Sequence, residues 1–112
     1  MLAFSTTNIF DKDLDRMEKR GKALFKIENI LTLLIEEQDL PRTLCDHPLK
    51  GNWDGYRELH IEPDWLLIYK KTESDLIAAR TGTHSDLFSN NVVDTFELPA
   101  QERLTNGLLR AE

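Results

Sequence analysis

The three histidines of this 112-residue chain are the first residues that could do chemistry, and all lie between residues 47 and 84. His47 precedes a proline, His60 lies on the polar side of the alternating stretch RELHIE, and His84 follows RTGT. The ordinary pKa of an imidazole is about 6.5, so histidine can donate or accept a proton near neutral pH. This grouping suggests acid–base catalysis.

Residues of other useful types accompany the histidines. Asp64 and Arg80 could converge with them at one edge of a sheet, where the guanidinium would hold a phosphate oxygen and stabilise negative charge. Trp65 or Phe88 could offer an aromatic face on which an unstacked base rests. RNA carries its own nucleophile, the 2′-hydroxyl, so such a site would need neither a metal nor a serine. The residue types therefore fit cleavage of an RNA phosphodiester.

Two other interpretations of the same residues stay open at this point. In the first, the three histidines are unrelated surface or turn residues, because alternation alone already places His60 outward. In the second, the histidines and Asp64 bind zinc, which takes three or four nitrogen, sulfur or oxygen ligands. The chain has no HExxH or CxxC motif and no close pair of histidines, so the spacing gives zinc less support.

The N-terminal part of the chain predicts a strand and two helices. LAFST has the composition of a short first strand, and Thr6 or Thr7 can cap a helix that ends near Gly21. A second helix with a wide apolar face is expected over roughly residues 23–38, before Pro41. The two helices are expected to form a hairpin.

After a loop over residues 39–55, the apolar period changes to two. GYRELHIE predicts a strand with one face in the core and one polar face that carries His60. DWLLIYKK is more continuously apolar, as in a central strand, and LIAARTGTH is a third strand with Arg80 and His84 at its end. Three strands with such short links form an antiparallel meander. The fold class is therefore α+β, with helices on one face of the sheet and the His60 face open.

Length, charge and cysteine content limit the function classes. The length fits one domain, and no apolar run approaches the roughly 18 residues that would span a membrane. The N-terminus lacks the pattern of a signal peptide, and the single cysteine, Cys45, suits the reducing cytoplasm. The formal charge of −6 argues against tight, sequence-blind binding of nucleic acid, so RNA binding must depend on local groups.

The segment DHPLKGNWDGYRELHIEPDWLLIYK, followed by ARTGTHSDLF, resembles the YafQ-type branch of the RelE/ParE toxin superfamily. Members of that branch are small ribosome-dependent mRNA endonucleases of bacterial type II toxin–antitoxin pairs. The resemblance covers residues 46–88. It implies a RelE-like toxin domain over residues 1–88, followed by a C-terminal extension over residues 89–112, with no cofactor and no metal in the site.

The resemblance also implies which residues form the site. The family's catalytic positions fall on His47, His60, Asp64, Arg80 and His84, and its nucleotide-positioning aromatics fall on Trp65 and Phe88. The implied reaction is attack of the 2′-hydroxyl on the adjacent phosphate, which leaves a 2′,3′-cyclic phosphate and a 5′-hydroxyl. We expect His84 to be the general acid and His60 or Asp64 the general base. His47 would transfer a second proton or contact the phosphate, and Arg80 would stabilise the transition state.

The implied partners are a cognate antitoxin that wraps the toxin, the ribosome with its mRNA, and operator DNA only through the antitoxin. No membrane is involved. Lys50 and Arg57 are expected to contact the substrate. Residues 1–88 carry 12 basic and 16 acidic side chains. Docking to the ribosome would therefore depend on a local basic patch, expected from Lys50, Arg57, Lys70, Lys71 and Arg80.

Two alternatives to an mRNA endonuclease remain. One is a non-catalytic toxin with the same fold that binds gyrase, as in the ParE branch. The other is a degenerate member that serves only as a co-repressor with its antitoxin, an idea that the acidic charge favours. A site rich in histidines and acids is needed for RNA cleavage but not for gyrase binding, so it favours the endonuclease. The extension over residues 89–112 could shield the site, add antitoxin contacts or have no role.

Overall fold

The computed structural model describes residues 1–88 and shows the expected α+β fold. Five strands form one sheet in the order β1-β5-β4-β3-β2. The strands are β1 (Ala3–Thr6), β2 (His47–Pro48), β3 (Arg57–Glu62), β4 (Trp65–Lys71) and β5 (Asp75–Gly82), and the α-helices are α1 (Asn8–Lys19), α2 (Leu24–Ile35) and α3 (His84–Phe88). Short 3-10 helices cover Arg42–Leu44 and Gly51–Trp53. The expected extension over residues 89–112 lies outside the described residues.

The helices begin and end where their backbone groups find partners. The hydroxyl of Thr7 accepts a hydrogen bond from the Phe10 backbone N–H at 2.9 Å, so the capping prediction for Thr7 is confirmed. After α1, Gly21 has a φ of +89°, and after α2, Glu37 has a φ of +57°. Both residues let the following N–H groups bond back to the last helical carbonyls. The second helix therefore ends at Ile35, earlier than the expected residue 38. No helix of residues 1–88 could cross a membrane.

The predicted meander is confirmed, because β3, β4 and β5 pair antiparallel in sequence order. β4 is the central strand, and its first five residues are all buried. β1 pairs in parallel with β5, so the sheet is mixed at that edge. β2 at the opposite edge was expected to be loop; it adds two residues antiparallel to β3.

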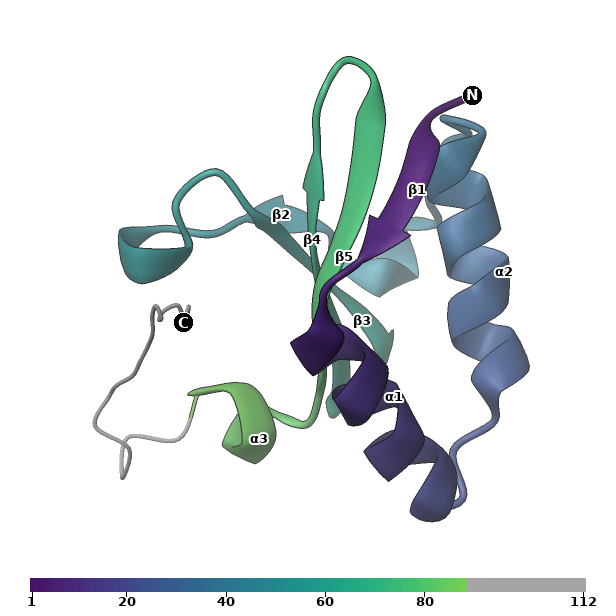
Figure 1. Ribbon diagram of the computed structural model, residues 1–112, viewed down its shortest axis with the longest axis vertical. Coiled ribbons are helices and arrows are strands. Elements are labelled where there is room, and N and C mark those ends of the chain that lie inside the picture. The colour runs from purple at the N-terminus through teal and green to yellow at the C-terminus, as the bar shows by residue number, and fades with distance from the viewer. Residues whose placement is uncertain (89–112) are drawn as a thin grey trace.

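The two faces of the sheet differ. Figure 1 shows α2 flanking one side of the sheet, and α3 and the segment after β2 on the other. The core lies on the helix side and contains Leu2, Phe10, Met17, Ile27, Ile30, Leu34, Leu59, Trp65, Leu67, Tyr69, Leu76 and Ala78. Leu66 and Ile68 alternate with these residues on β4, and they belong to the opposite face. That opposite face carries the candidate site.

Candidate active site

The strand register brings the separated site residues together on the face away from α1 and α2. Residues that pair across neighbouring strands share a face. His47 pairs with Glu58, Glu58 with Ile68, and Ile68 with Arg80, which makes one row across four strands. In the next row, His60 pairs with Leu66 and Leu66 with Gly82, and His84 follows two residues later. The three histidines therefore converge, and Arg80 belongs to the same rows of the sheet.

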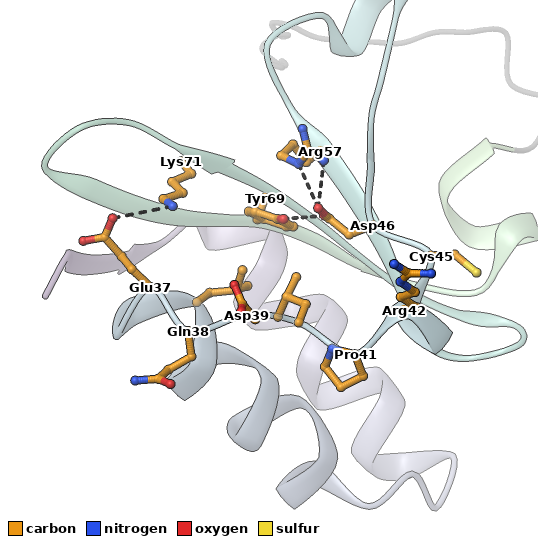
Figure 2. A pocket seen from close by; sticks show the side chains of 12 residues that line it. Glu37, Gln38, Asp39, Pro41, Arg42, Cys45, Asp46, Arg57, Tyr69 and Lys71 are labelled. Carbon is orange, nitrogen blue, oxygen red and sulfur yellow. Dashed lines mark hydrogen bonds and ion pairs between the residues drawn. The ribbon is translucent and has the colours of Figure 1, made fainter.

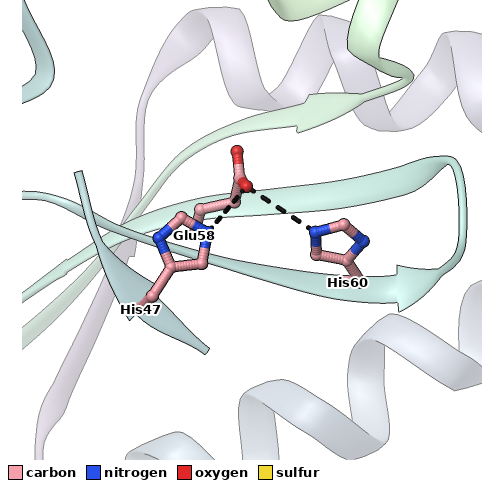
Figure 3. A group of neighbouring side chains, drawn as sticks. All are labelled: His47, Glu58 and His60. Carbon is pink, nitrogen blue, oxygen red and sulfur yellow. Dashed lines mark hydrogen bonds and ion pairs between the residues drawn. The ribbon is translucent and has the colours of Figure 1, made fainter. Parts of the chain in front are cut away.

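A buried carboxylate joins two of the histidines. Oε2 of Glu58 lies 3.1 Å from Nε2 of His47 and 3.7 Å from Nε2 of His60, as Figure 3 shows. Glu58 is only 7% exposed, whereas His47 is half exposed. Nδ1 of His47 lies 3.1 Å from the Pro48 carbonyl oxygen, so both ring nitrogens of His47 face acceptors. The two contacts fix the orientation of the His47 ring beside Glu58.

A second carboxylate holds His84. Oδ1 of Asp64 accepts hydrogen bonds from the His84 backbone N–H at 2.9 Å and from its ring Nδ1 at 2.6 Å. These two bonds, the backbone one first, lower the pKa of the Asp64 carboxyl below its ordinary value. With Nδ1 engaged, Nε2 is the ring atom that can meet a substrate. The rings of His84 and His60 are 5.7 Å apart between centroids, so the two histidine–carboxylate groups are neighbours.

Arg80 is fixed by a buried aspartate. Its Nε and Nη2 donate to the two carboxylate oxygens of Asp13 at 2.7 and 3.1 Å. Asp13 is 2% exposed and also accepts from Arg16 and from the Thr81 backbone N–H. Two guanidinium groups thus share one carboxylate. The ion pairs restrict the orientation of Arg80, and two guanidinium groups on one carboxylate leave a net positive charge.

The sequence analysis did not identify Glu58 and Asp13 as site residues, although signals for both were present. Glu58 alternates with His60, so it had to share the polar face of β3. Asp13 occupies the apolar stripe of α1 between Phe10 and Met17, where an unpaired charge would be costly. A charged residue on a buried stripe therefore predicts a partner, which here is Arg80.

The expectation that Trp65 stacks on a base is wrong. Its side chain is 0% exposed and belongs to the core on the helix side of the sheet. Its Nε1 donates a hydrogen bond to the Thr81 hydroxyl at 2.9 Å, so its polar atom is satisfied inside the protein. A pairing irregularity between His60 and Glu62 sets the register at this corner. Phe88, at the end of α3, is 37% exposed and remains available for stacking.

Arg57, which was expected to contact the substrate, lies on the other face of the sheet from Glu58 and His60. Arg57 pairs with Tyr69 on the core face of β3, and its Nε and Nη2 donate to Oδ2 of Asp46 at 3.0 and 2.8 Å. The Tyr69 hydroxyl donates to the other oxygen of Asp46. Figure 2 shows these side chains and Lys71 lining a pocket of about 650 Å³ beside α2.

The expected basic patch is therefore not one surface. Arg57 and Lys71 line the pocket beside α2, whereas Arg80 pairs with Ile68 on β4 and bonds Asp13 of α1. The Lys70 amine lies 5.6 Å from the centroid of the Tyr56 ring, just before β3. Lys50 is exposed between β2 and the following 3-10 helix, and its contact with substrate stays a prediction.

The same face has a ligand set that a metal ion could use. Three residues each offer one ligand atom, and these atoms all lie within 4.8 Å of one another: His47, Glu58 and His60. Two imidazoles and a carboxylate suit zinc or copper better than magnesium. Asp64, which the zinc interpretation included, instead binds His84.

The sheet order, the covering helices and the acid–base groups on the open face define the class of protein that the resemblance implies, a small RelE-like toxin. Comparison with known protein families then identifies the branch. The family model for the bacterial toxin of type II toxin–antitoxin systems, YafQ, matches residues 2–89. The chain belongs to the YafQ toxin family.

Individual relatives agree with this assignment. The mRNA interferase toxin YafQ of Escherichia coli (strain K12) is 49% identical over 80 residues, which are 70% of this chain and 87% of the relative. A putative toxin YafQ of Haemophilus influenzae is 34% identical over 77 residues, or 66% of this chain and 76% of the relative.

Solved structures extend the agreement to the fold. The E. coli DinJ–YafQ complex contains a chain with a TM-score of 0.75 and 43% identity, covering 80% of this chain and all of that one. A YafQ with a histidine-to-glutamine mutation gives a TM-score of 0.76 and 42% identity with the same coverage. A metal-bound toxin from Helicobacter pylori gives 0.74 and 41%, covering 79% of this chain and all of that one.

Proposed function

We propose that this toxin is an mRNA interferase, an endoribonuclease that cleaves RNA through attack of the 2′-hydroxyl on the adjacent phosphate. One observation carries the proposal. Two histidines on the open sheet face, each beside its own carboxylate, have ring centroids 5.7 Å apart. This spacing suits two proton-transfer groups on either side of one phosphate, so the reaction needs no bound metal.

His84 is the general acid in this proposal. Asp64 accepts a hydrogen bond from its Nδ1–H, which directs Nε2 to the substrate. The side chain of His84 is 53% exposed, so a leaving 5′-oxygen can reach it. The proton then passes from Nε2 to that oxygen as the phosphorus–oxygen bond breaks.

His60 is the general base. Asp64 was an alternative, but its Oδ1 already accepts two N–H groups of His84, and its lowered pKa makes it a weaker base. His60 lies next to Glu58 on the open face, where its ring can take up the proton of the 2′-hydroxyl.

The remaining groups bind the substrate. Arg80, fixed by Asp13, provides positive charge for the phosphate as its negative charge increases, and His47, oriented by Glu58, contacts the phosphate. Phe88 provides the stacking surface for a nucleotide. Trp65 supports the site from beneath by packing in the core.

Family membership supports the biological setting of this reaction. Relatives are named mRNA interferase toxins, and one is solved with the protein DinJ. For this chain we propose that the substrate is mRNA on the ribosome and that the protein acts in the cytoplasm. We also propose a cognate antitoxin as partner, and contact with operator DNA only through that antitoxin. The toxin domain would span residues 1–88, with residues 89–112 as an extension. A gyrase-binding toxin or a pure co-repressor would not require two carboxylate-bound histidines.

The test is induction in cells, followed by mapping of the cut ends of a reporter transcript. The wild-type toxin should cut within translated codons and leave 2′,3′-cyclic phosphate ends. His84→Ala should reduce cleavage by about 10²–10⁴-fold while still binding the antitoxin, and Ser85→Ala, its exposed neighbour on α3, should cleave normally.

A folded His84→Ala protein that still cleaves would exclude the proposed acid. Growth arrest with intact mRNA and gyrase-linked DNA breaks would favour the gyrase alternative.

A second test uses purified toxin and metal ions. EDTA should leave cleavage unchanged. Zn²⁺ or Cu²⁺ bound by His47, Glu58 and His60 should inhibit cleavage, because the metal occupies the lone pair with which His60 takes up a proton.

A further inference from the structure

The short helix α3 carries two proposed site residues and cannot hold itself in place. It has five residues, with His84 at its start and Phe88 at its end. Helices of this length are not stable in water on their own, because too few hydrogen bonds offset the cost of the first turn. The position of His84 relative to His60 therefore depends on what attaches α3 to the rest of the protein.

The first attachment is a reciprocal cap at the start of α3. The carboxylate of Asp86 accepts a hydrogen bond from the Thr83 backbone N–H at 2.9 Å, and the Thr83 hydroxyl accepts one from the Asp86 N–H at 3.2 Å. The preceding Gly82 leaves room for this arrangement, since a Cβ there would lie 2.9 Å from Oδ2 of Asp86. Asp86 therefore packs tightly against the end of β5.

The second attachment reaches another helix. Nη1 and Nη2 of Arg20, at the C-terminal end of α1, donate to Oδ2 and Oδ1 of Asp86 at 2.7 and 3.2 Å. Nη1 also lies 3.6 Å from the sulfur of Met17, which is fully buried. The bidentate pair thus links α3 to a helix whose inner face is anchored in the core. The Arg20 hydrogen bonds also hold the pKa of Asp86 well below its ordinary range.

We propose that Arg20 and Asp86 are positioning residues of the RNA-cleaving site, whose ion pair fixes α3 on α1 and thereby places His84 and Phe88 opposite His60. This inference rests on the proposed function. Neither residue reaches the reacting atoms. Asp64 also holds the start of α3 through its bond from the His84 backbone N–H, but it is 65% exposed in the β3–β4 turn, whereas Arg20 extends from a helix that is anchored in the core.

The pair is expected to affect catalysis more than stability. Exposed ion pairs contribute little to folding, and the side chain of Arg20 is 41% exposed. Misplacing a catalytic group by about 1 Å can cost on the order of 10²-fold in rate. Loss of the pair should therefore lower kcat in a protein that is otherwise folded normally.

The experiment compares Arg20→Gln with Lys19→Gln, which removes the same charge one residue away. On mRNA, Arg20→Gln should lower kcat by about 10- to 100-fold, with a rise in KM no larger than that of Phe88→Ala, whereas Lys19→Gln should behave as wild type. Asp86→Asn should reproduce the loss, and the double variant should be no worse than either single variant. In a His84→Ala background, Arg20→Gln should lower kcat no further, because the effect of the pair on kcat acts through His84.

A second measurement is independent of cleavage. The Leu87 amide donates to the Thr83 carbonyl at 3.1 Å, so its hydrogen exchange reports on the attachment of α3. Exchange should accelerate in Arg20→Gln and not in Lys19→Gln. Unchanged kcat in Arg20→Gln, a rise confined to KM, or unchanged exchange would overturn the inference. A wild-type protein that cleaves no RNA would instead overturn the proposed function.

Discussion

The two carboxylate–histidine groups of the site contain the same chemical groups in different surroundings. Glu58 is 7% exposed on a central part of the sheet and lies beside both His47 and His60. Asp64 is 65% exposed in a turn and serves His84 alone. The first group is held by strand pairing, and the second by side-chain contacts around a short helix. In the proposed mechanism, the base side is therefore rigid and the acid side is accessible.

The strongest test of this comparison concerns the base side, where Glu58 touches two histidines. We expect His60→Ala to reduce single-turnover cleavage by about 10²–10⁴-fold, because it removes the general base. His47→Ala should cost about tenfold, since an interaction with the phosphate is weakened while proton transfer persists. The reverse order of effects would assign the base to His47.

The next test separates the exposed aromatic residue from the buried one. Phe88→Ala should raise KM by about tenfold at unchanged melting temperature, because stacking on a base contributes about 1–3 kcal/mol. Trp65→Phe should instead lower stability by about 1–3 kcal/mol through loss of the bond to Thr81. Thermal unfolding and cleavage kinetics measured side by side check this contrast. A raised KM in a stable Trp65→Phe protein would restore the stacking role.

Low pH should weaken the attachment of α3, on the acid side of the site. The pKa of Asp64 is lowered by its bonds from His84, and that of Asp86 by Arg20. A lowered carboxyl pKa means that the stabilisation is present above the ordinary value of about 4 and is lost as pH falls below it. Protection of the Leu87 amide, corrected for intrinsic exchange, should therefore hold from pH 8 to 5 and decrease at lower pH. A loss already near neutrality would contradict this.

The smallest effect is expected on the far side of the sheet. Arg57→Gln should leave cleavage within about twofold of wild type, because its guanidinium bonds Asp46 beside α2 and not the substrate. Cleavage assays with ribosome-bound mRNA and with free RNA check this. A large loss of cleavage at unchanged stability would return Arg57 to the substrate-binding residues.

Much of the fold could be predicted, because it depends on local patterns. The Thr7 cap, the left-handed turn at Gly21 and the meander all follow from residue types at fixed spacing. The early end of α2 could not be predicted in this way, since it depends on Glu37 adopting a conformation that few non-glycine residues take. The pairing of His47 with Glu58 involves only two residues of β2 and leaves no periodic signal.

The sequence by itself determined the types and order of the elements, the outward face of His60 and membership of the YafQ family. Only the tertiary structure decided which aromatic is exposed, which cation faces the histidines and which carboxylate serves which imidazole. The reason is physical. In β4 every residue from Trp65 to Tyr69 is buried, so no alternation distinguishes its two faces. Strand register and helix packing decide the face, and both depend on contacts between residues far apart in the chain.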